Sequence, residues 1–144
     1  GEIQDLSQCQ IEDFDALILP GGFGAAKNLC DFATQGANCQ VDPQIVALCQ
    51  RFHQADKPLG FICIAPAMIP KIFTDSVAMT VGNDAETVAA IKQMGGNHVE
   101  CGVEDVVVDP SHKIVSTPAY MLAKRISEAR TGIDKLVREV IALI

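Results

Sequence analysis

The chain has 144 residues, 49% of them hydrophobic, and carries a net charge of −7 with a pI near 4.8. This length and apolar content suffice for one globular domain with its own core. The acidic charge argues against nucleic acid or an anionic membrane surface as partner, and no apolar run approaches the ~20 residues of a membrane span. Six scattered cysteines show no CxxC pair and no metal-like cluster. They suit a reducing cytoplasm, or an organelle interior such as the mitochondrion, better than a disulfide scaffold.

The first third of the chain predicts one strand and one amphipathic helix. Residues 1–15 are polar and predict a loop with a short helical piece, whereas residues 16–19 predict a buried strand that runs into a glycine-rich turn. Asp42 and Pro43 then predict a helix start, as N-cap and first helical residue. This helix has one apolar face at i, i+3, i+4, i+7 spacing, formed by Ile45, Leu48, Cys49 and Phe52.

The next apolar run leads into a cysteine. Residues 59–62 predict a buried strand, and after Cys63 come small residues and a proline, which the first turn of a helix tolerates. Cys63 is therefore predicted to lie on a sharp turn between strand and helix, the arrangement of a nucleophile elbow. Backbone N–H groups and the positive helix end favour a thiolate there. A buried structural cysteine is the alternative interpretation.

A glycine turn complements this elbow. Gly21 and Gly22 follow the first strand, and glycine lets backbone N–H groups approach a ligand closely, as an oxyanion hole requires. Both turns should project from the carboxyl edge of one parallel sheet, where open α/β folds bind ligands. Taken alone, the glycine turn indicates only a tight strand-to-helix connection. Together with Cys63 it predicts a catalytic site.

Beyond the elbow, the pattern alternates between strands and helices. Residues 77–81 predict a strand, and residues 82–84 cap a helix that stops at residues 95–96. A short strand is expected around residues 98–101.

The last part of the chain predicts a hairpin and two helices. Residues 106–108 and 114–117 flank a turn-rich link and predict a β-hairpin. Two helices are expected over residues 120–130 and 133–144, separated at Thr131 and Gly132. The alternation of strands and helices predicts an α/β fold: a three-layer α/β/α sandwich with a mostly parallel, flavodoxin-like sheet.

Three motifs carry a family resemblance: LPGGFGAAKNL at residues 19–29, CIAPAMIPKIF at 63–73 and TPAYMLA at 117–123. In this order they resemble the PfpI-type cysteine proteins of the class I glutamine-amidotransferase-like superfamily. Within it they most resemble the glyoxalase-like, enhancing-lycopene-biosynthesis (ElbB) branch. Members carry a further strand–helix–strand region before this point, with an acidic residue that hydrogen-bonds the cysteine. The resemblance thus implies that residues 1–144 are a single domain, the C-terminal two-thirds of a glutamine-amidotransferase-like domain.

The resemblance also implies an activity and its residues. A glyoxalase-like, or deglycase-like, enzyme uses its cysteine on small reactive dicarbonyls such as glyoxal and gives hydroxy acids. Here Cys63 would be the nucleophile, with the N–H groups of Gly22 and Ile64 as oxyanion donors and Gly21 shaping the turn. No cofactor or metal is implied, and a homodimer is expected. The family pattern places three residues in the walls of the substrate pocket: Phe23, Thr117 and Pro118.

The chain departs from the family pattern in its histidines. Cysteine hydrolases, including glutamine amidotransferases, use a histidine base to activate the thiol. Many relatives carry one downstream of the cysteine, in a region that reads TVGND at residues 80–84 here. His53, His98 and His112 are expected to be surface residues. The missing histidine base argues against an amidotransferase or protease mechanism. It argues less strongly against a mechanism in which the thiolate attacks an aldehyde directly. The alternative function is non-catalytic: Cys63 as a redox-sensing thiol, or a domain that works through a partner.

Overall fold

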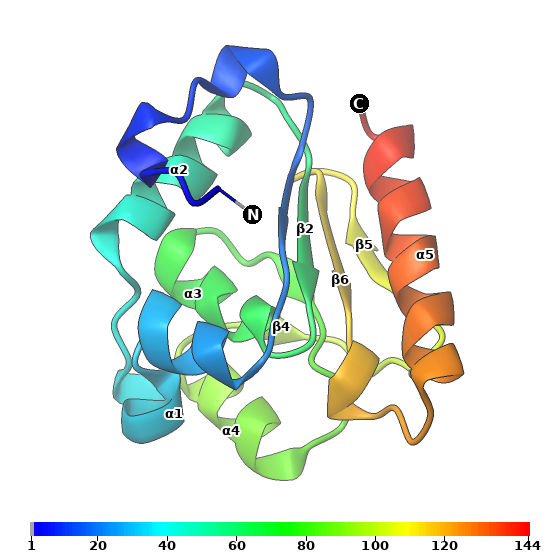
Figure 1. Cartoon of the computed structure of the whole chain (residues 1–144). Helices are drawn as coiled ribbons and strands as arrows, with labels where there is room; N and C mark the ends of the chain where they lie inside the picture. The colour runs from blue at the N-terminus through cyan, green and yellow to red at the C-terminus, as the bar shows by residue number, and fades with distance from the viewer. Residues whose placement is uncertain (1) are drawn as a thin grey trace.

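A four-stranded sheet forms the centre of the computed structural model, which describes residues 2–144 (Figure 1). Its strands are β1 (Leu17–Leu19), β2 (Leu59–Ile62), β6 (Ile114–Thr117) and β5 (Val107–Asp109), in the order β1-β2-β6-β5. β1, β2 and β6 run parallel, and β5 pairs antiparallel with β6 at the edge. The predicted, mostly parallel sheet and its hairpin are confirmed.

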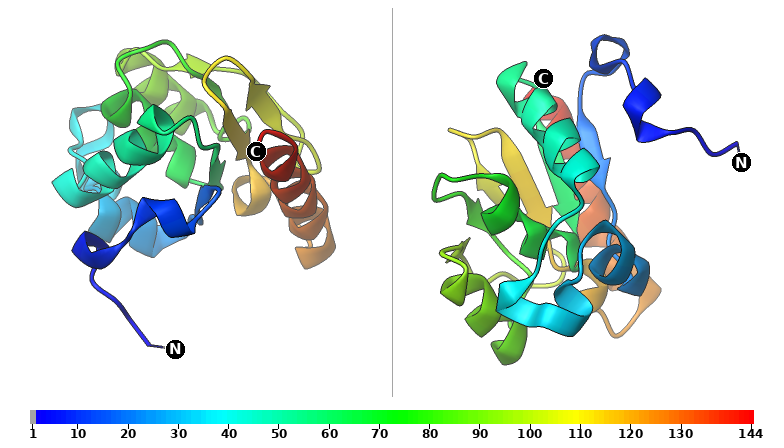
Figure 2. Two further views of the ribbon diagram at one scale, coloured as in Figure 1. Left: turned by 90° about the horizontal axis from the view of Figure 1, so that it is seen from above. Right: turned by 90° about the vertical axis from the view of Figure 1, so that its left-hand side faces the viewer.

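Helices cover both faces of this sheet. In Figure 2, α5 (Ile126–Ala142) lies on one side, and α2 (Pro43–Gln54), α3 (Ile69–Ile72) and α4 (Ala85–Gln93) lie on the other. α1 (Phe32–Gln35) is a single turn near α4. The three-layer α/β/α arrangement expected from the alternating pattern is therefore present.

Each side of the sheet has its own apolar core. Phe52 of α2, Phe61 of β2 and Met68 are almost fully buried in the larger one. Val115 of β6 packs with Leu136 of α5 in the other. Because β2 is covered on both faces, all four of its residues are buried, as expected for a central parallel strand.

The start of α2 follows the predicted capping. The Asp42 carboxylate accepts a hydrogen bond from the Gln44 N–H (2.8 Å), and Pro43 is the first helical residue. The apolar face at Ile45, Leu48, Cys49 and Phe52 is buried, as predicted. Burial raises the pKa of the Cys49 thiol to about 12, so this cysteine belongs to the core.

The C-terminal helices are one element, so the predicted break at residues 131–132 is wrong. α5 runs unbroken through Gly132. A glycine at this position lets the helix pass very close to Val103 and Thr117. A Cβ added at Gly132 would lie 2.5 Å from the Val103 carbonyl oxygen and 2.8 Å from the Thr117 hydroxyl. Ahead of α5 there is only a 3-10 turn, Ala119–Met121.

Other predicted elements are shorter in the structure. β3 (Ala78–Met79) and β4 (Asn97–His98) form a separate two-stranded parallel sheet, where longer strands were expected. The expected N-terminal loop contains two 3-10 turns, Leu6–Gln8 and Ile11–Asp13, and residue 1 lies outside the described residues. Among residues 2–144, no helix combines the length and the apolar character needed to cross a bilayer.

Asp109 joins the small sheet to the hairpin. The residue is 7% exposed, and its carboxylate accepts hydrogen bonds from the Ala78 N–H (2.9 Å) and the Ser111 hydroxyl (2.7 Å). It also accepts from the His112 N–H (3.1 Å) and lies 2.9 Å from Nδ1 of that ring. Burial acts to raise the pKa of Asp109, but the bonds from Ser111, Ala78 and His112 outweigh it and lower the pKa to about 2.

Acid should therefore destabilise the domain through Asp109. Its folded pKa lies below its ordinary value, so the stabilisation is present above about pH 4 and is lost as the pH falls toward 2. We expect Asp109→Asn to lower the free energy of unfolding by on the order of 2 kcal/mol at pH 7. The variant should also lose part of the acid dependence between pH 5 and 2, as measured by urea unfolding across that range. An unchanged pH profile would contradict this role.

Candidate functional site

Cys63 occupies a strained turn at the end of β2. Its φ is +65°, in the left-handed region that costs a non-glycine residue about 1–2 kcal/mol. The Cys63 N–H donates to the Thr117 carbonyl (2.9 Å), which fixes the turn against the end of β6. A 3-10 helix, Ala65–Met68, then begins with Pro66 in its first turn. The structure thus places Cys63 on the sharp strand-to-helix turn that the sequence predicts.

The surroundings of the thiol differ from a freely exposed elbow. Cys63 is only 7% exposed and packs in one apolar cluster with Ile62, Val115 and Ala119. The helix after it consists of one 3-10 turn followed by the single turn of α3, so its dipole is small. The helix end therefore contributes little to stabilising a thiolate at Cys63.

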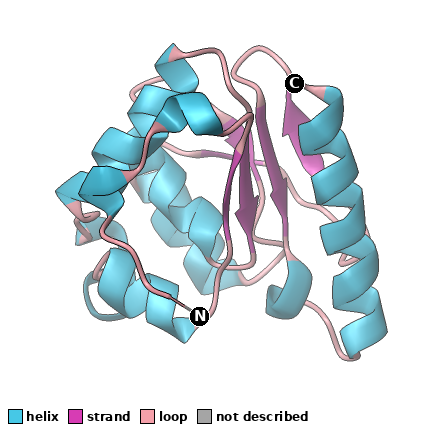
Figure 3. Ribbon diagram, turned by 45° about the horizontal axis from the view of Figure 1, so that its top comes forward, coloured by secondary structure: helices cyan, strands magenta, loops and turns pink. Residues whose placement is uncertain are grey.

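The glycine turn after β1 lies directly against the elbow. A Cβ added at Gly21 would lie 2.6 Å from Cβ of Cys63, 2.6 Å from the Ile62 carbonyl oxygen and 3.0 Å from the Ile64 nitrogen. Gly22 has a φ of +100°, which favours glycine. β1 and β2 are parallel neighbours, so both turns emerge at the same edge of the sheet (Figure 3).

Two backbone donors of these turns are unused. Within residues 2–144, the N–H groups of Gly22 and Ile64 donate to no protein acceptor. Backbone N–H groups at the start of a helical turn have no partner within the helix, and free ones at a reactive group are what an oxyanion hole needs. The structure therefore places Gly21 against Cys63 and Ile64, with Gly22 next in the same turn. The role of these N–H groups as oxyanion donors stays a prediction.

The residues expected in the pocket walls lie in different environments. Phe23 is 75% exposed, whereas Thr117 and Pro118 are buried. The Thr117 hydroxyl donates to the Asp105 carbonyl (2.8 Å) on the side of α5, so only its backbone meets the elbow. A hollow of about 530 Å³ lined by Asp105, Lys135 and neighbouring residues does not include Cys63.

Ala119 is a feature that the sequence analysis missed. It is fully buried, has a φ of +43° and follows β6 at the same edge as Cys63. Alanine is not typical of the left-handed region, so the sequence gives no signal for it. Strained backbone of this kind clusters at functional sites, and here two such residues end neighbouring strands.

The three histidines are partly exposed, as expected for surface residues, but each also has partners in the fold. His98 in β4 is half-buried and accepts a hydrogen bond from the Val81 N–H (3.3 Å). Burial, with Lys92 nearby, lowers the pKa of His98. His53 and His112 stack with ring centroids 6.1 Å apart, near Asp109 at the far end of the hairpin from Thr117. Among the described residues, no histidine hydrogen-bonds Cys63, and no three His, Cys, Asp or Glu side chains are grouped as metal ligands.

No family model matches the chain, but it is similar in sequence to individual proteins. It is 38% identical over 152 residues to the ES1 protein homolog, mitochondrial, of Rattus norvegicus, with 99% of this chain and 57% of that protein covered. It is 40% identical over 152 residues to the human glutamine amidotransferase-like class 1 domain-containing protein 3, mitochondrial, with 99% and 56% covered. The chain thus spans little more than half the length of these relatives.

Solved structures agree in fold. An isoprenoid biosynthesis protein with an amidotransferase-like domain from Ehrlichia chaffeensis superposes with a TM-score of 0.85 at 30% identity, over 97% of this chain and 64% of that one. Drosophila melanogaster DJ-1beta, at 16% identity and a TM-score of 0.54 over 96% and 66% of the two chains, shares the fold alone. Along nearly its whole length and in its fold, the chain is similar to glutamine amidotransferase-like proteins and to ES1 homologues, in agreement with the resemblance that its three motifs carry.

Proposed function

We propose that this domain is a cofactor-independent, glyoxalase-like enzyme that converts small dicarbonyls into hydroxy acids. One observation carries the proposal: Cys63 is held in a strained turn directly against Gly21, and the next N–H group in each of the two turns, that of Gly22 and that of Ile64, donates to no protein acceptor. Nothing in the fold requires a left-handed cysteine at the end of β2, since a glycine would form the same turn without strain. The arrangement suits a thiolate that attacks a carbonyl carbon and two donors that receive the oxygen.

The proposed reaction needs no external oxidant. The Cys63 thiolate forms a C–S bond to the aldehyde carbon, and the C=O electron pair moves to the oxygen near Gly22 and Ile64. The proton on that carbon then moves to the neighbouring carbonyl carbon through an enediol, so the aldehyde carbon is oxidised to a thioester and the ketone is reduced to an alcohol. Water cleaves the thioester, and the thiolate leaves. Overall, R–CO–CHO and water give R–CHOH–COOH.

The proton transfers need a base, and we assign them to a carboxylate rather than to histidine. Within residues 2–144, no carboxylate is hydrogen-bonded or ion-paired to Cys63 or to the glycine turn. The family resemblance implies an acidic residue that hydrogen-bonds the cysteine, and the proposal assigns the proton transfers to that residue. Addition of the thiol to an aldehyde can occur without it, so the first step can be tested on this chain alone.

Competition with alkylation tests that first step. Methylglyoxal should slow the reaction of Cys63 with iodoacetamide, because the hemithioacetal removes the free thiol. Hydrogen bonds from the oxyanion donors should stabilise the hemithioacetal by about 1.4 kcal/mol. The methylglyoxal concentration that gives half-maximal protection of Cys63 should therefore be about ten-fold lower than the concentration needed at an ordinary thiol. Peptide mapping reports every cysteine at once, and half-buried Cys101 is the matched control. Equal protection of Cys63 and Cys101 would overturn the proposal and leave Cys63 to the non-catalytic alternative.

A further inference from the structure

Thr117 is the last residue of β6 and contacts the elbow through its backbone. Its carbonyl accepts the hydrogen bond from the Cys63 N–H (2.9 Å), one position beyond the pairing of Ile62 with Thr117. The hydrogen-bond ladder between β2 and β6 therefore continues into the turn itself. A cysteine in the left-handed region persists only where its surroundings hold it there, so the turn depends on the position of this carbonyl.

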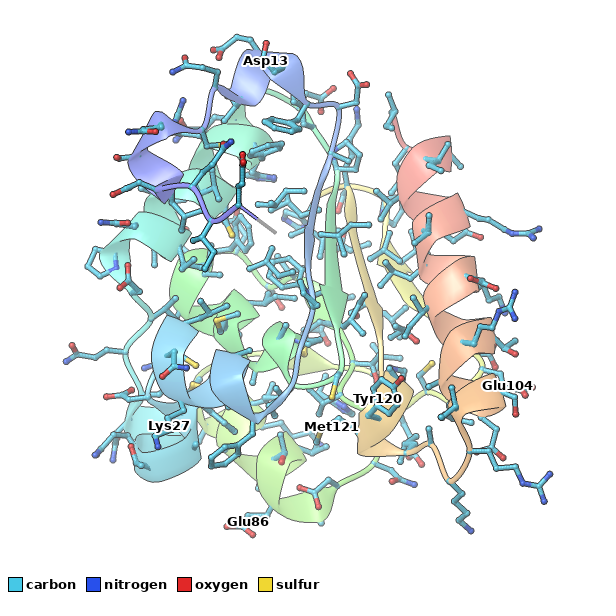
Figure 4. All side chains as sticks on the ribbon, viewed as in Figure 1. Asp13, Lys27, Glu86, Glu104, Tyr120 and Met121 are labelled. Atoms are coloured by element: carbon cyan, nitrogen blue, oxygen red, sulfur yellow. The ribbon has the colours of Figure 1, made fainter. Side chains whose placement is uncertain are left out.

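The side chain of Thr117 is held from another direction. It is fully buried, and its hydroxyl donates to the Asp105 carbonyl (2.8 Å). Asp105 closes a turn through the hydrogen bond from its N–H to the Gly102 carbonyl (3.1 Å), and Lys135 of α5 forms an ion pair with the Asp105 carboxylate. Figure 4 shows Glu104, from the same turn, beside α5. The Thr117 hydroxyl therefore connects this turn to the end of β6.

α5 lies against the same hydroxyl. A Cβ added at Gly132 would be 2.8 Å from the Thr117 hydroxyl oxygen and 2.5 Å from the Val103 carbonyl oxygen. The hydroxyl thus lies between the backbone of α5 and the turn at residues 102–105. Because the hydroxyl and the carbonyl belong to one residue, a contact that fixes the first also restricts the carbonyl that holds Cys63.

We infer that Thr117 is a positioning residue for the reaction of Cys63 and acts through its hydroxyl. The hydrogen bond to Asp105 fixes the Thr117 carbonyl, and this carbonyl holds the cysteine in its strained turn. The Cys63 N–H is engaged in the same bond, so the oxyanion has to be received by other donors. This role differs from the pocket wall that the family resemblance implies. The inference rests on the proposed function, because it concerns the reactivity of the cysteine.

Protection of Cys63 by methylglyoxal tests the role of the hydroxyl. Thr117→Val keeps the shape of the side chain but removes the hydroxyl, so the roughly ten-fold advantage of Cys63 over Cys101 should fall to about two-fold. Thr117→Ser keeps the hydroxyl and should keep the advantage to within about two-fold. If the valine variant does not fold, Thr117→Ala takes its place, since the alanine and serine variants differ in the hydroxyl alone.

Ser116→Ala is the matched control. Ser116 precedes Thr117 in β6, is also fully buried, and accepts a hydrogen bond from the Thr80 N–H (3.0 Å). Its substitution, like Thr117→Val, leaves a backbone group without its side-chain partner. The free energy of unfolding should therefore fall to a similar extent in both variants, as measured by urea denaturation. Only Thr117→Val should reduce the advantage of Cys63.

Amide hydrogen exchange, measured by NMR, separates the position of the turn from its chemistry. The reference is the Leu59 amide, which donates to the Lys113 carbonyl (2.9 Å) at the start of β2. In Thr117→Val, the Cys63 amide should exchange about ten-fold faster relative to Leu59, whereas in Ser116→Ala the two amides should change together.

Four results would overturn the inference. They are an unchanged exchange ratio in Thr117→Val, a protection advantage that survives this substitution, an advantage lost in Thr117→Ser, and an equal loss in Ser116→Ala. If the unsubstituted protein shows no advantage of Cys63 over Cys101, the proposed function itself fails. Amide exchange then decides alone whether Thr117 holds the turn.

Discussion

Replacing Cys63 with serine is expected to lower methylglyoxal turnover by the intact protein by on the order of 10³-fold or more. A serine hydroxyl is a far weaker nucleophile than a thiolate unless a base activates it, and no histidine hydrogen-bonds this position among residues 2–144. The measurement is the rate of lactate formation under saturating methylglyoxal. The proposed mechanism leaves no route by which the serine variant could keep its activity.

The interpretation requires that the serine variant be folded. Serine is close to cysteine in size and should accept the same left-handed turn, so the free energy of unfolding should change by only about 1 kcal/mol. Cys101→Ser is the control for loss of a thiol in general, since Cys101 is half-buried and its pKa is raised by burial and Asp105. Full activity of Cys63→Ser, or a comparable loss in Cys101→Ser, would end the enzymatic proposal in this form.

Local signals in the sequence predicted most of the architecture. The Asp42–Pro43 start of α2 and its apolar face depend on contacts within one helix, so capping and periodicity were enough. The continuous apolar run of β2 indicated a strand covered on both faces. The turn at Cys63 could likewise be predicted because a strand, a cysteine and an early proline leave few other conformations.

Features set by contacts between distant segments could not be predicted. Gly132 resembles a helix break, but it is the place where α5 passes against Val103 and Thr117. The burial of Cys63 depends on Val115 and Ala119, which lie more than fifty positions further along the chain. The left-handed backbone of Ala119 has no residue signature at all. The half-buried histidines follow the same rule, since His112 is engaged by Asp109 and by the ring of His53.

The closest approach in the candidate site is the one between Gly21 and the elbow, and Gly21→Ala should disrupt it. The new methyl group would lie 2.6 Å from both Cβ of Cys63 and the Ile62 carbonyl, distances that real Cβ atoms do not show. Backbone atoms cannot rotate away as a flexible side chain can, so the two turns must separate. Overpacking of this kind costs about 1–3 kcal/mol of unfolding free energy, which urea denaturation would measure.

Separation of the turns should also remove the special reactivity of Cys63. Misplacement of a reacting group by about 1 Å can cost on the order of 10² in rate, and Gly22 moves together with Gly21. In Gly21→Ala, methylglyoxal should therefore protect Cys63 from alkylation no better than it protects Cys101.

Gly24→Ala is the matched control, three positions along the chain. Its added Cβ would meet only the Asn28 amide, at 3.7 Å, and its backbone is already helical. Stability and protection should both be nearly unchanged in that variant, because it adds the same methyl group without touching the elbow. If Gly21→Ala kept the protection seen in the unsubstituted protein, the glycine turn would have no part in the chemistry of Cys63.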